Sequence, residues 1–454
     1  MIKTVNKPLL TQPLKTSPAT GASLASLGIR NSIPLMHGSQ GCGAFAKVYL
    51  IQHLREPIPI QNTAIDQVSA VMGGDDNLYD ALRLLCEKNQ PELITVMTTG
   101  LTEMQGTDIF RVVATFKKDF PQYSQTRIVT VNTPDFVGTM QSGFALTVNS
   151  MVKQLVKPPK NRDKKRKQVN VLLSVALTSA DIETIKLYLD AFNFDSIIVP
   201  DLSLSLDGHL NSDDFSPTST GGTSVLEIEL MSESTSTIVI GESMLETAKW
   251  LERRFDIPYF DAGLLMDMEG IDRFISYLHQ HSGVSVPSWI DRARCRLQDA
   301  MLDTHFVVMG EAVSMALEPD LAQGYANLFA SVGVQVNQII TTADTKNLHD
   351  VDALEIIVGG LNEIDIRRHP VKALIGNTHL AESVDGHIPV LRAGYPCHDR
   401  FGNMDVAQIG YQGVRQRLFA LANLILDNHV EEVKPFSSQY RFSVNEVSQN
   451  KGAA

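Results

Sequence analysis

Residues 169–200, VNVLLSVALTSADIETIKLYLDAFNFDSIIVP, contain the pattern that decides the fold. The runs 169–177 and 196–200 are mainly apolar, as expected for strands buried on both faces of a sheet. Between them, Thr178 or Ser179 can cap a helix, and apolar residues then recur on one helical face: Ile182, Ile185, Leu189 and Phe192. Two buried strands joined by a helix are typical of a parallel βαβ unit.

The same alternation recurs along the whole chain and predicts parallel sheets flanked by helices. Further strands are predicted at 93–100, 127–134, 236–241, 306–310, 334–342, 354–360 and 373–377. Further helices are predicted at 77–89, 246–254 and 289–301. Three such blocks predict three doubly wound α/β domains over 1–160, 161–285 and 286–454, the last with a C-terminal helix and tail. The basic segment 157–168 is interpreted as a linker, and 203–224 as a long loop.

Composition narrows the classes of protein that fit. The chain has 454 residues, of which 43% are hydrophobic and 20% charged, so it can bury sizeable cores. Its net charge of −12 argues against a nucleic-acid binder, because the phosphate backbone would be repelled. No apolar run reaches the roughly 18 residues that span a bilayer. The N-terminus lacks the apolar region of a secretory signal, so a cytoplasmic protein without membrane contact is expected.

The segment HGSQGCGAFAK, residues 37–47, is the strongest candidate for chemistry. Three glycines, at 38, 41 and 43, lie close to Cys42 in the sequence, and an apolar helical pattern follows them. This pattern predicts that Cys42 lies near a helix N-terminus. A thiolate in a glycine-rich turn suits a metal cluster, because Gly41 and Gly43 leave room for its bulk. A small buried cysteine in a tight turn fits the same spacing. The motif by itself leaves both interpretations open.

The other three cysteines are weaker candidates. Cys86 lies on an apolar helical pattern that predicts a core position, and Cys295 is predicted to be part-buried on a helix. Cys397, His398 and Asp399 are adjacent in the chain, an arrangement that rarely aims three side chains at one atom. An iron–sulfur cluster needs four ligands, so a cluster at Cys42 would take most of them from another chain.

Six segments, taken in order, resemble the β-type chains of nitrogenase component 1 and its assembly relatives: 37–42, 53–57, 69–74, 98–103, 133–138 and 391–396. The resemblance implies three α/β domains with parallel sheets. Catalytic β chains supply three cysteines to the eight-iron P-cluster, of which one matches Cys42. The other two fall near Ser17 and at Gly100, so two of the three ligands are absent. The chain is therefore similar to the β-like subunits of the scaffold that matures the iron–molybdenum cofactor.

For such a subunit the resemblance implies a non-catalytic role, with Cys42 as one ligand of an interface 4Fe–4S cluster. Gly41 and Gly43 would border the cluster, and the partner NifE would supply the other three cysteines. It also implies a heterotetramer with two copies each, NifB as donor of the cofactor precursor, NifH as helper and apo-nitrogenase as acceptor. The precursor would be bound transiently by the complex. Two alternatives stay open: the β subunit of a nitrogenase-like oxidoreductase, and a metal-free structural subunit.

Overall fold

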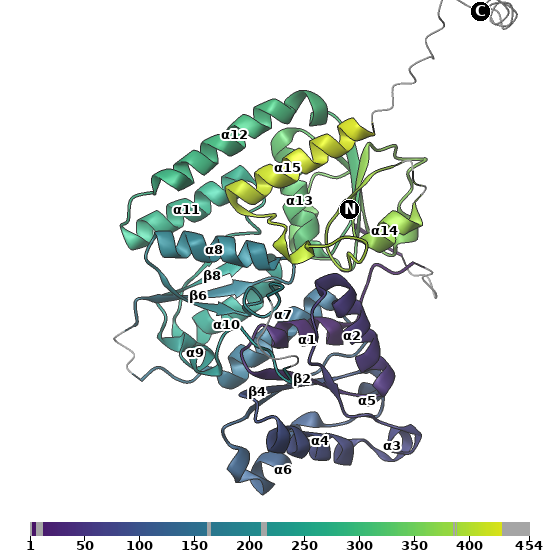
Figure 1. Ribbon diagram of the computed structural model, residues 1–454, viewed down its shortest axis with the longest axis vertical. Coiled ribbons are helices and arrows are strands. Elements are labelled where there is room, and N and C mark those ends of the chain that lie inside the picture. The colour runs from purple at the N-terminus through teal and green to yellow at the C-terminus, as the bar shows by residue number, and fades with distance from the viewer. Residues whose placement is uncertain are drawn as a thin grey trace, which may run out of the picture.

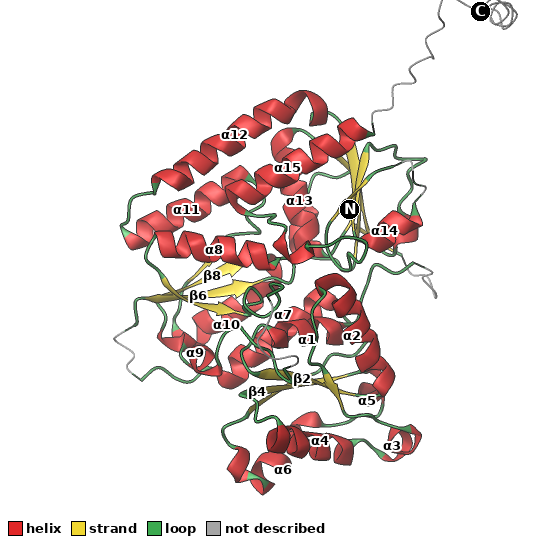
Figure 2. Ribbon diagram, viewed as in Figure 1, coloured by secondary structure: helices red, strands yellow, loops and turns green. Residues whose placement is uncertain are grey.

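Three parallel sheets with helices on both faces make up the chain (Figures 1 and 2). The structure is a computed structural model and describes residues 2–5, 12–160, 165–209, 216–384, 386 and 388–428. The predicted fold class, α/β with doubly wound parallel sheets, is confirmed. The strands of the first and second sheets fall within the predicted domains 1–160 and 161–285, whereas the third sheet draws its strands from 286–454 and from Ile2–Thr4 at the start of the chain. The domain boundaries stay a prediction.

The first sheet has the strand order β3-β2-β4-β5 and occupies the lower part of Figure 1. Its strands are β2 (Ser32–His37), β3 (Gln61–Asn62), β4 (Leu93–Thr98) and β5 (Arg127–Val131). The helices of this region are α1 (Pro18–Leu27), α2 (Gln40–Leu54), α3 (Gln67–Met72), α4 (Asp75–Lys88), α5 (Gly100–Met104), α6 (Ile109–Asp119) and α7 (Met140–Leu155). The predicted strands at 93–100 and 127–134 and the helix at 77–89 are confirmed.

The second sheet has the order β7-β6-β8-β9. Its strands are β6 (Gln168–Leu173), β7 (Asp195–Val199), β8 (Ser236–Ile240) and β9 (Tyr259–Asp261). The helices around it are α8 (Ser179–Ala191), α9 (Val225–Glu229), α10 (Leu245–Phe255) and α11 (Met268–Ser282). The predicted βαβ unit is β6–α8–β7, and Thr178 caps α8 by accepting from the backbone N–H of Asp181 at 3.1 Å.

The third sheet has the order β1-β12-β11-β10-β13-β14. Its strands are β1 (Ile2–Thr4), β10 (Ala312–Ala316), β11 (Gln335–Thr341), β12 (Glu355–Val358), β13 (Ala373–Gly376) and β14 (Val390–Arg392). The helices are α12 (Ser288–Val308), α13 (Pro319–Val332), α14 (Thr378–Ser383) and α15 (Gly410–Asp427). The predicted C-terminal helix is α15, and the tail after residue 428 lies outside the described residues.

One predicted strand is wrong. Residues 306–308 form the last turn of α12 rather than a strand, and the first strand of the third sheet follows at Ala312–Ala316. Within that turn Val308 is buried, whereas Phe306 is 95% exposed. A short apolar run is compatible both with a helix that buries one face and with a buried strand, so the run at 306–310 did not distinguish the two.

The segment predicted as a linker forms ion pairs with the helical segment before β8, and the described parts of the predicted long loop lack regular structure. The basic segment 157–168 holds ion pairs from Lys157 to Glu229 and from Arg166 Nε to Glu233 Oε2, the latter at 2.5 Å. Residues 203–209 and 216–224 contain neither helix nor strand, as predicted, and the residues between them lie outside the described part. Within the described ranges, no helix is long and apolar enough to cross a membrane.

Two glycines bring α1 and α7 into close contact in the first region. A Cβ atom on Gly21 would lie 1.9 Å from the carbonyl oxygen of Met140, and one on Gly143 would lie 2.0 Å from that of Pro18. No side chain fits at either position without moving a backbone. All ten residues of α1 are buried as a result, so α1 forms part of the main core.

Asp320 joins segments that belong to all three sheets. Its carboxylate accepts from Ser174 Oγ and Ser243 Oγ at 2.6 Å each and from Gln141 Nε2 at 3.3 Å. Gly241, with φ of 97°, makes room, because a Cβ there would lie 2.7 Å from Asp320 Oδ2. Burial raises the pKa of Asp320. These hydrogen bonds therefore link all three regions at one buried carboxylate.

Glu318 is the second buried carboxyl group at this junction. Its Oε2 accepts from Thr139 Oγ1 at 3.1 Å and from Thr342 Oγ1 at 2.5 Å. Burial raises the pKa of Glu318 from 4.5 to about 7, and the neighbouring Asp320 adds to that rise.

We expect Glu318→Gln to flatten the decline of stability with pH. Below about pH 4.5 the carboxyl is protonated in both folded and unfolded chains. Between about 4.5 and 7 the unfolded chain loses its proton first, so folding loses stability, by about 3 kcal/mol in total. A glutamine carries no such proton. Urea unfolding at about pH 5 and pH 8 should show the variant gaining up to about 3 kcal/mol over wild type. Glu252→Gln, on the exposed face of α10, is the control, and parallel profiles for wild type and Glu318→Gln would contradict the expectation.

Candidate functional site

The carboxyl edge of the first sheet brings together segments that follow different strands. β2 and β4 are neighbours, with β3 beyond β2 and β5 beyond β4, so the strand order reverses between β2 and β4. Such a reversal opens a crevice at the carboxyl ends of the strands, where doubly wound folds bind ligands. Cys42 follows β2 and Gly100 follows β4, so both lie at this edge.

Cys42 is the third residue of α2 and is half-buried. Its Sγ lies 3.6 Å from Oγ of Ser39, the residue that precedes the helix. Asn62 Nδ2 donates to the carbonyl oxygen of Ser39 at 2.7 Å and so holds the turn against β3. Backbone N–H groups in the first turn of a helix lack partners within the helix and stabilise an anionic ligand. The prediction that Cys42 lies near a helix N-terminus is confirmed.

The two glycines beside Cys42 have different surroundings. Gly41 is exposed, and a Cβ there would meet only Ser39 Oγ, at 4.0 Å. Gly43 is buried, and a Cβ there would lie 3.1 Å from Asn62 Nδ2. Gly41 therefore leaves open space next to Cys42, whereas Gly43 allows α2 to pack closely on β3. A contact of either glycine with a cofactor stays a prediction.

His37, the last residue of β2, fixes this edge. Its carbonyl oxygen accepts from Thr99 Oγ1 at 3.2 Å and from Thr102 Oγ1 at 3.0 Å, which ties the turn after β2 to the turn after β4. Its Nδ1 is 3.0 Å from Thr63 Oγ1. Burial lowers the pKa of His37 to about 4, so the imidazole is neutral at pH 7. The segment that carries Cys42 is therefore held by hydrogen bonds on both sides.

Asp135 joins the two positions at which the resemblance places the missing cysteines. Ser17 Oγ donates to Asp135 Oδ1, and the backbone N–H of Gly100 donates to Asp135 Oδ2 at 2.9 Å. A Cβ on Gly100 would lie 3.2 Å from the same oxygen. A carboxylate thus occupies the space beside both positions. Sequence reasoning did not single out Asp135, although its place just after β5 assigns it to this edge.

Apolar side chains are exposed around this edge. On α2, Phe45 is 61% and Val48 54% exposed, and beyond Asp135 the side chains of Phe136 and Val137 are exposed as well. Phe45, Val48 and Ser17 line one cavity of about 520 Å³. Neighbouring exposed apolar side chains of this size are typical of a surface that another protein covers.

The other cysteines lie elsewhere. Cys86 is buried in the core, as predicted, and burial raises the pKa of its thiol. Cys295 is exposed on α12, so the predicted part-buried position is wrong: the helix turns this residue away from its packed face. Cys397 is buried, donates to the carbonyl oxygen of Gly394 at 3.3 Å, and has a pKa raised by burial to about 12. Among the described residues, Cys42 is the cysteine at the carboxyl edge of the first sheet.

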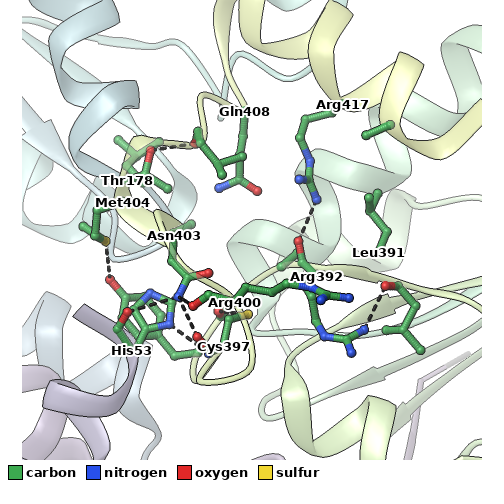
Figure 3. A pocket seen from close by; sticks show the side chains of 18 of the residues that line it. His53, Thr178, Leu391, Arg392, Cys397, Arg400, Asn403, Met404, Gln408 and Arg417 are labelled. Atoms are coloured by element: carbon green, nitrogen blue, oxygen red, sulfur yellow. Dashed lines mark hydrogen bonds between the residues drawn. The ribbon is translucent and has the colours of Figure 1, made fainter. Parts of the chain in front are cut away.

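A second cavity, of about 360 Å³, lies where the end of α2 meets the third sheet (Figure 3). The backbone N–H of Cys397 donates to His53 Nδ1 at 2.9 Å, and Asn403 Nδ2 donates to the carbonyl oxygen of His53 at 3.1 Å. Burial lowers the pKa of His53 to about 3, so the ring is a neutral acceptor. Asp399 forms an ion pair with Arg392 at 2.7 Å rather than with His398. Cys397, His398 and Asp399 are therefore not arranged as a nucleophile triad. The cavity wall therefore anchors the helix that carries Cys42.

The comparisons with known proteins agree on one family. The family described as "Nitrogenase component 1 type Oxidoreductase" matches residues 17–426. A protein of Klebsiella pneumoniae is 40% identical over 93% of each chain, and one of Nostoc is 41% identical over 96% of this chain and 97% of its own. Both carry the name "Nitrogenase iron-molybdenum cofactor biosynthesis protein NifN".

A solved structure has the same fold over nearly its whole length. It is titled "Nitrogenase Cp1 at pH 6.5", superimposes with a TM-score of 0.89 and is 26% identical. The superposition covers 96% of this chain and 98% of the other. The similarity therefore extends through all three sheets.

Proposed function

The chain belongs to the family of nitrogenase component 1 type oxidoreductases, and on that premise we propose that it is a scaffold subunit in the biosynthesis of the iron–molybdenum cofactor. Relatives that match it over more than nine-tenths of their length are named as cofactor biosynthesis proteins. No residue is assigned a catalytic role in this proposal.

The observation that carries the proposal is the composition of the carboxyl edge of the first sheet. Cys42 lies at this edge, with open space beside Gly41. Ser17 and Gly100 both donate hydrogen bonds to Asp135. A 4Fe–4S cluster needs four ligands, so this chain would supply Cys42 and a partner the remaining three. These residues fit such a cluster because the thiol is half-buried at a helix N-terminus that favours anionic ligands. When bound, the cluster would supply one-electron transfer between NifH and the cofactor precursor.

The proposed partner is NifE, in a heterotetramer with two copies of each chain. The exposed apolar side chains on α2 and beyond Asp135 support a subunit interface here, because burying them in a partner is favourable. Within this proposal NifB delivers the iron–molybdenum cofactor precursor, which the complex binds transiently, mostly through NifE. NifH assists maturation, and apo-nitrogenase receives the product. The complex acts in the cytoplasm.

An enzyme subunit is the second candidate, because the solved structure with the same fold is a nitrogenase component. Against it, an eight-iron cluster would need thiolates where this chain has Ser17 and Gly100. A metal-free structural subunit is the third candidate, and it predicts that the iron content does not depend on Cys42.

Reconstitution of cofactor transfer tests the scaffold proposal. The chain, co-expressed with NifE and purified without oxygen, is mixed with NifB product, molybdenum, homocitrate, NifH and ATP, and then with apo-nitrogenase. We expect substrate reduction only after apo-nitrogenase is added. Substrate reduction by the complex and NifH alone would support the enzyme subunit instead. A complex of NifE with a curated NifN relative, run in parallel, is the positive control. If that complex activates apo-nitrogenase and the complex with this chain does not, the scaffold role is contradicted.

A further inference from the structure

Three side chains with metal-binding atoms converge near α14. His379 and Glu382 lie on this helix, and His398 lies in the loop after β14. One ligand atom from each lies within 4.8 Å of the other two. The two imidazole rings are 5.5 Å apart, and His379 Nδ1 is 3.7 Å from Glu382 Oε2. Within the described ranges, this is the place where three such groups meet.

The backbone on both sides of this cluster is held in place. Asn377 caps α14 by accepting from the backbone N–H of Leu380 at 3.0 Å, which fixes His379 and Glu382 three residues apart on one face. His398 is held at both ends of its peptide: its N–H donates to Thr378 Oγ1 at 3.0 Å, and its carbonyl accepts from Arg55 Nη2 at 2.7 Å. The two segments therefore cannot drift apart when the side chains turn.

We propose that His379, Glu382 and His398 bind a divalent transition-metal ion such as Zn²⁺ or Fe²⁺. Two imidazole nitrogens and one carboxylate are a donor set for such ions, whereas Mg²⁺ and Ca²⁺ prefer oxygen ligands alone. Metal–ligand bonds of about 2.1 Å place ligand atoms roughly 3 to 3.5 Å apart, so the widest of the present separations, at most 4.8 Å, must close by up to about 1.5 Å. The side chains of His379 and Glu382 are 45% and 61% exposed, which leaves them free to rotate by that amount.

The position of the cluster leaves part of the coordination sphere open. His379 and Glu382 line the same cavity of about 520 Å³ as Ser17 and Phe45. An ion with three protein ligands keeps at least one further position for water or an oxygen ligand that enters this cavity. The site shares its cavity with Phe45 of the proposed subunit interface, so its test on the complex rests on the proposed pairing with NifE. None of its three ligands is assigned to the interface cluster, so loss of Co²⁺ in the histidine variants and loss of iron in Cys42→Ala are separate outcomes.

Cobalt binding tests the proposal. Co²⁺ replaces Zn²⁺ at such sites, and its visible absorption reports coordination by the protein. The full chain in its complex with NifE, with Cys42 and its cluster in place, is dialysed against a chelator, checked for retained iron and titrated with Co²⁺, which is read as a difference spectrum and counted by elemental analysis. We expect one Co²⁺ per chain. His379→Ala and His398→Ala should each weaken binding at least about tenfold, because even the loss of an outer-sphere partner costs that much.

His349→Ala is the matched control. His349 is an exposed imidazole, its Nε2 is 2.8 Å from Asp344 Oδ1, and it faces one carboxylate without a second histidine. We expect this variant to bind Co²⁺ as wild type does. Circular dichroism melting confirms that each variant is folded. Equal Co²⁺ stoichiometry and affinity in wild type, His379→Ala and His398→Ala, or no Co²⁺ absorption in wild type, would overturn the proposal.

Discussion

Replacing Cys42 with alanine should remove about four iron atoms and four sulfides per chain from the complex with NifE, leaving the complex assembled. Among the described residues, Cys42 is the one cysteine at the carboxyl edge of the first sheet, so its thiolate is the ligand that we propose this chain supplies. A cluster held by three ligands in contact with water is easily lost. Iron and acid-labile sulfide, measured after purification without oxygen, check the expectation.

Cys295→Ala is the matched control for that experiment. Cys295 is exposed on α12, on a different part of the molecule, so its removal should leave iron and sulfide unchanged. The subunit ratio, measured by gel filtration and mass spectrometry, shows whether the complex is intact. Unchanged iron in an intact Cys42→Ala complex would exclude Cys42 as a required ligand. It would leave either a structural subunit without metal or a cluster held wholly by the partner.

Replacing Asp320 with alanine should destabilise the junction of the three sheets by about 3 kcal/mol or more, because three hydrogen-bond donors lose the acceptor that they share. The change leaves Ser174, Ser243 and Gln141 without their shared acceptor. Ser174 and Gln141 are buried, whereas Ser243 is half-buried. Each unsatisfied polar group costs about 1 to 3 kcal/mol, less whatever the hydroxyls recover by rotating. Loss of the carboxylate also opens a small void against Gly241.

Hydrogen exchange measured by mass spectrometry reports this local loss of stability. Peptides from α13, from the turn at Glu242–Met244 and from the start of α7 should exchange at least about 100-fold faster, because 1.4 kcal/mol is a factor of ten in an opening equilibrium. Asp299→Ala is the control, since Asp299 is exposed on α12 and such changes usually stay within about 0.5 kcal/mol. Exchange as slow in Asp320→Ala as in Asp299→Ala would show that the junction does not depend on this carboxylate.

The pattern of the chain predicted most of the strands and the helix at Cys42, because burial imposes a period on each element. Strands buried on both faces are apolar throughout, and amphipathic helices repeat every three to four residues. The same rule fails for short runs, as at 306–310, where a helix end with Val308 buried has the composition of a strand. The strand Ile2–Thr4 escaped prediction because three residues carry no period.

The sequence alone determined the fold class and pointed to Cys42, since both follow from periodicity, glycine spacing and cysteine count. Tertiary structure alone decided that Asp135 joins Ser17 to Gly100, that Ile2–Thr4 pairs with β12, and that His398 faces His379. The physical reason is the same for all three. Each depends on contacts between residues distant in the chain, and such contacts leave no repeat in the local sequence from which they could be predicted.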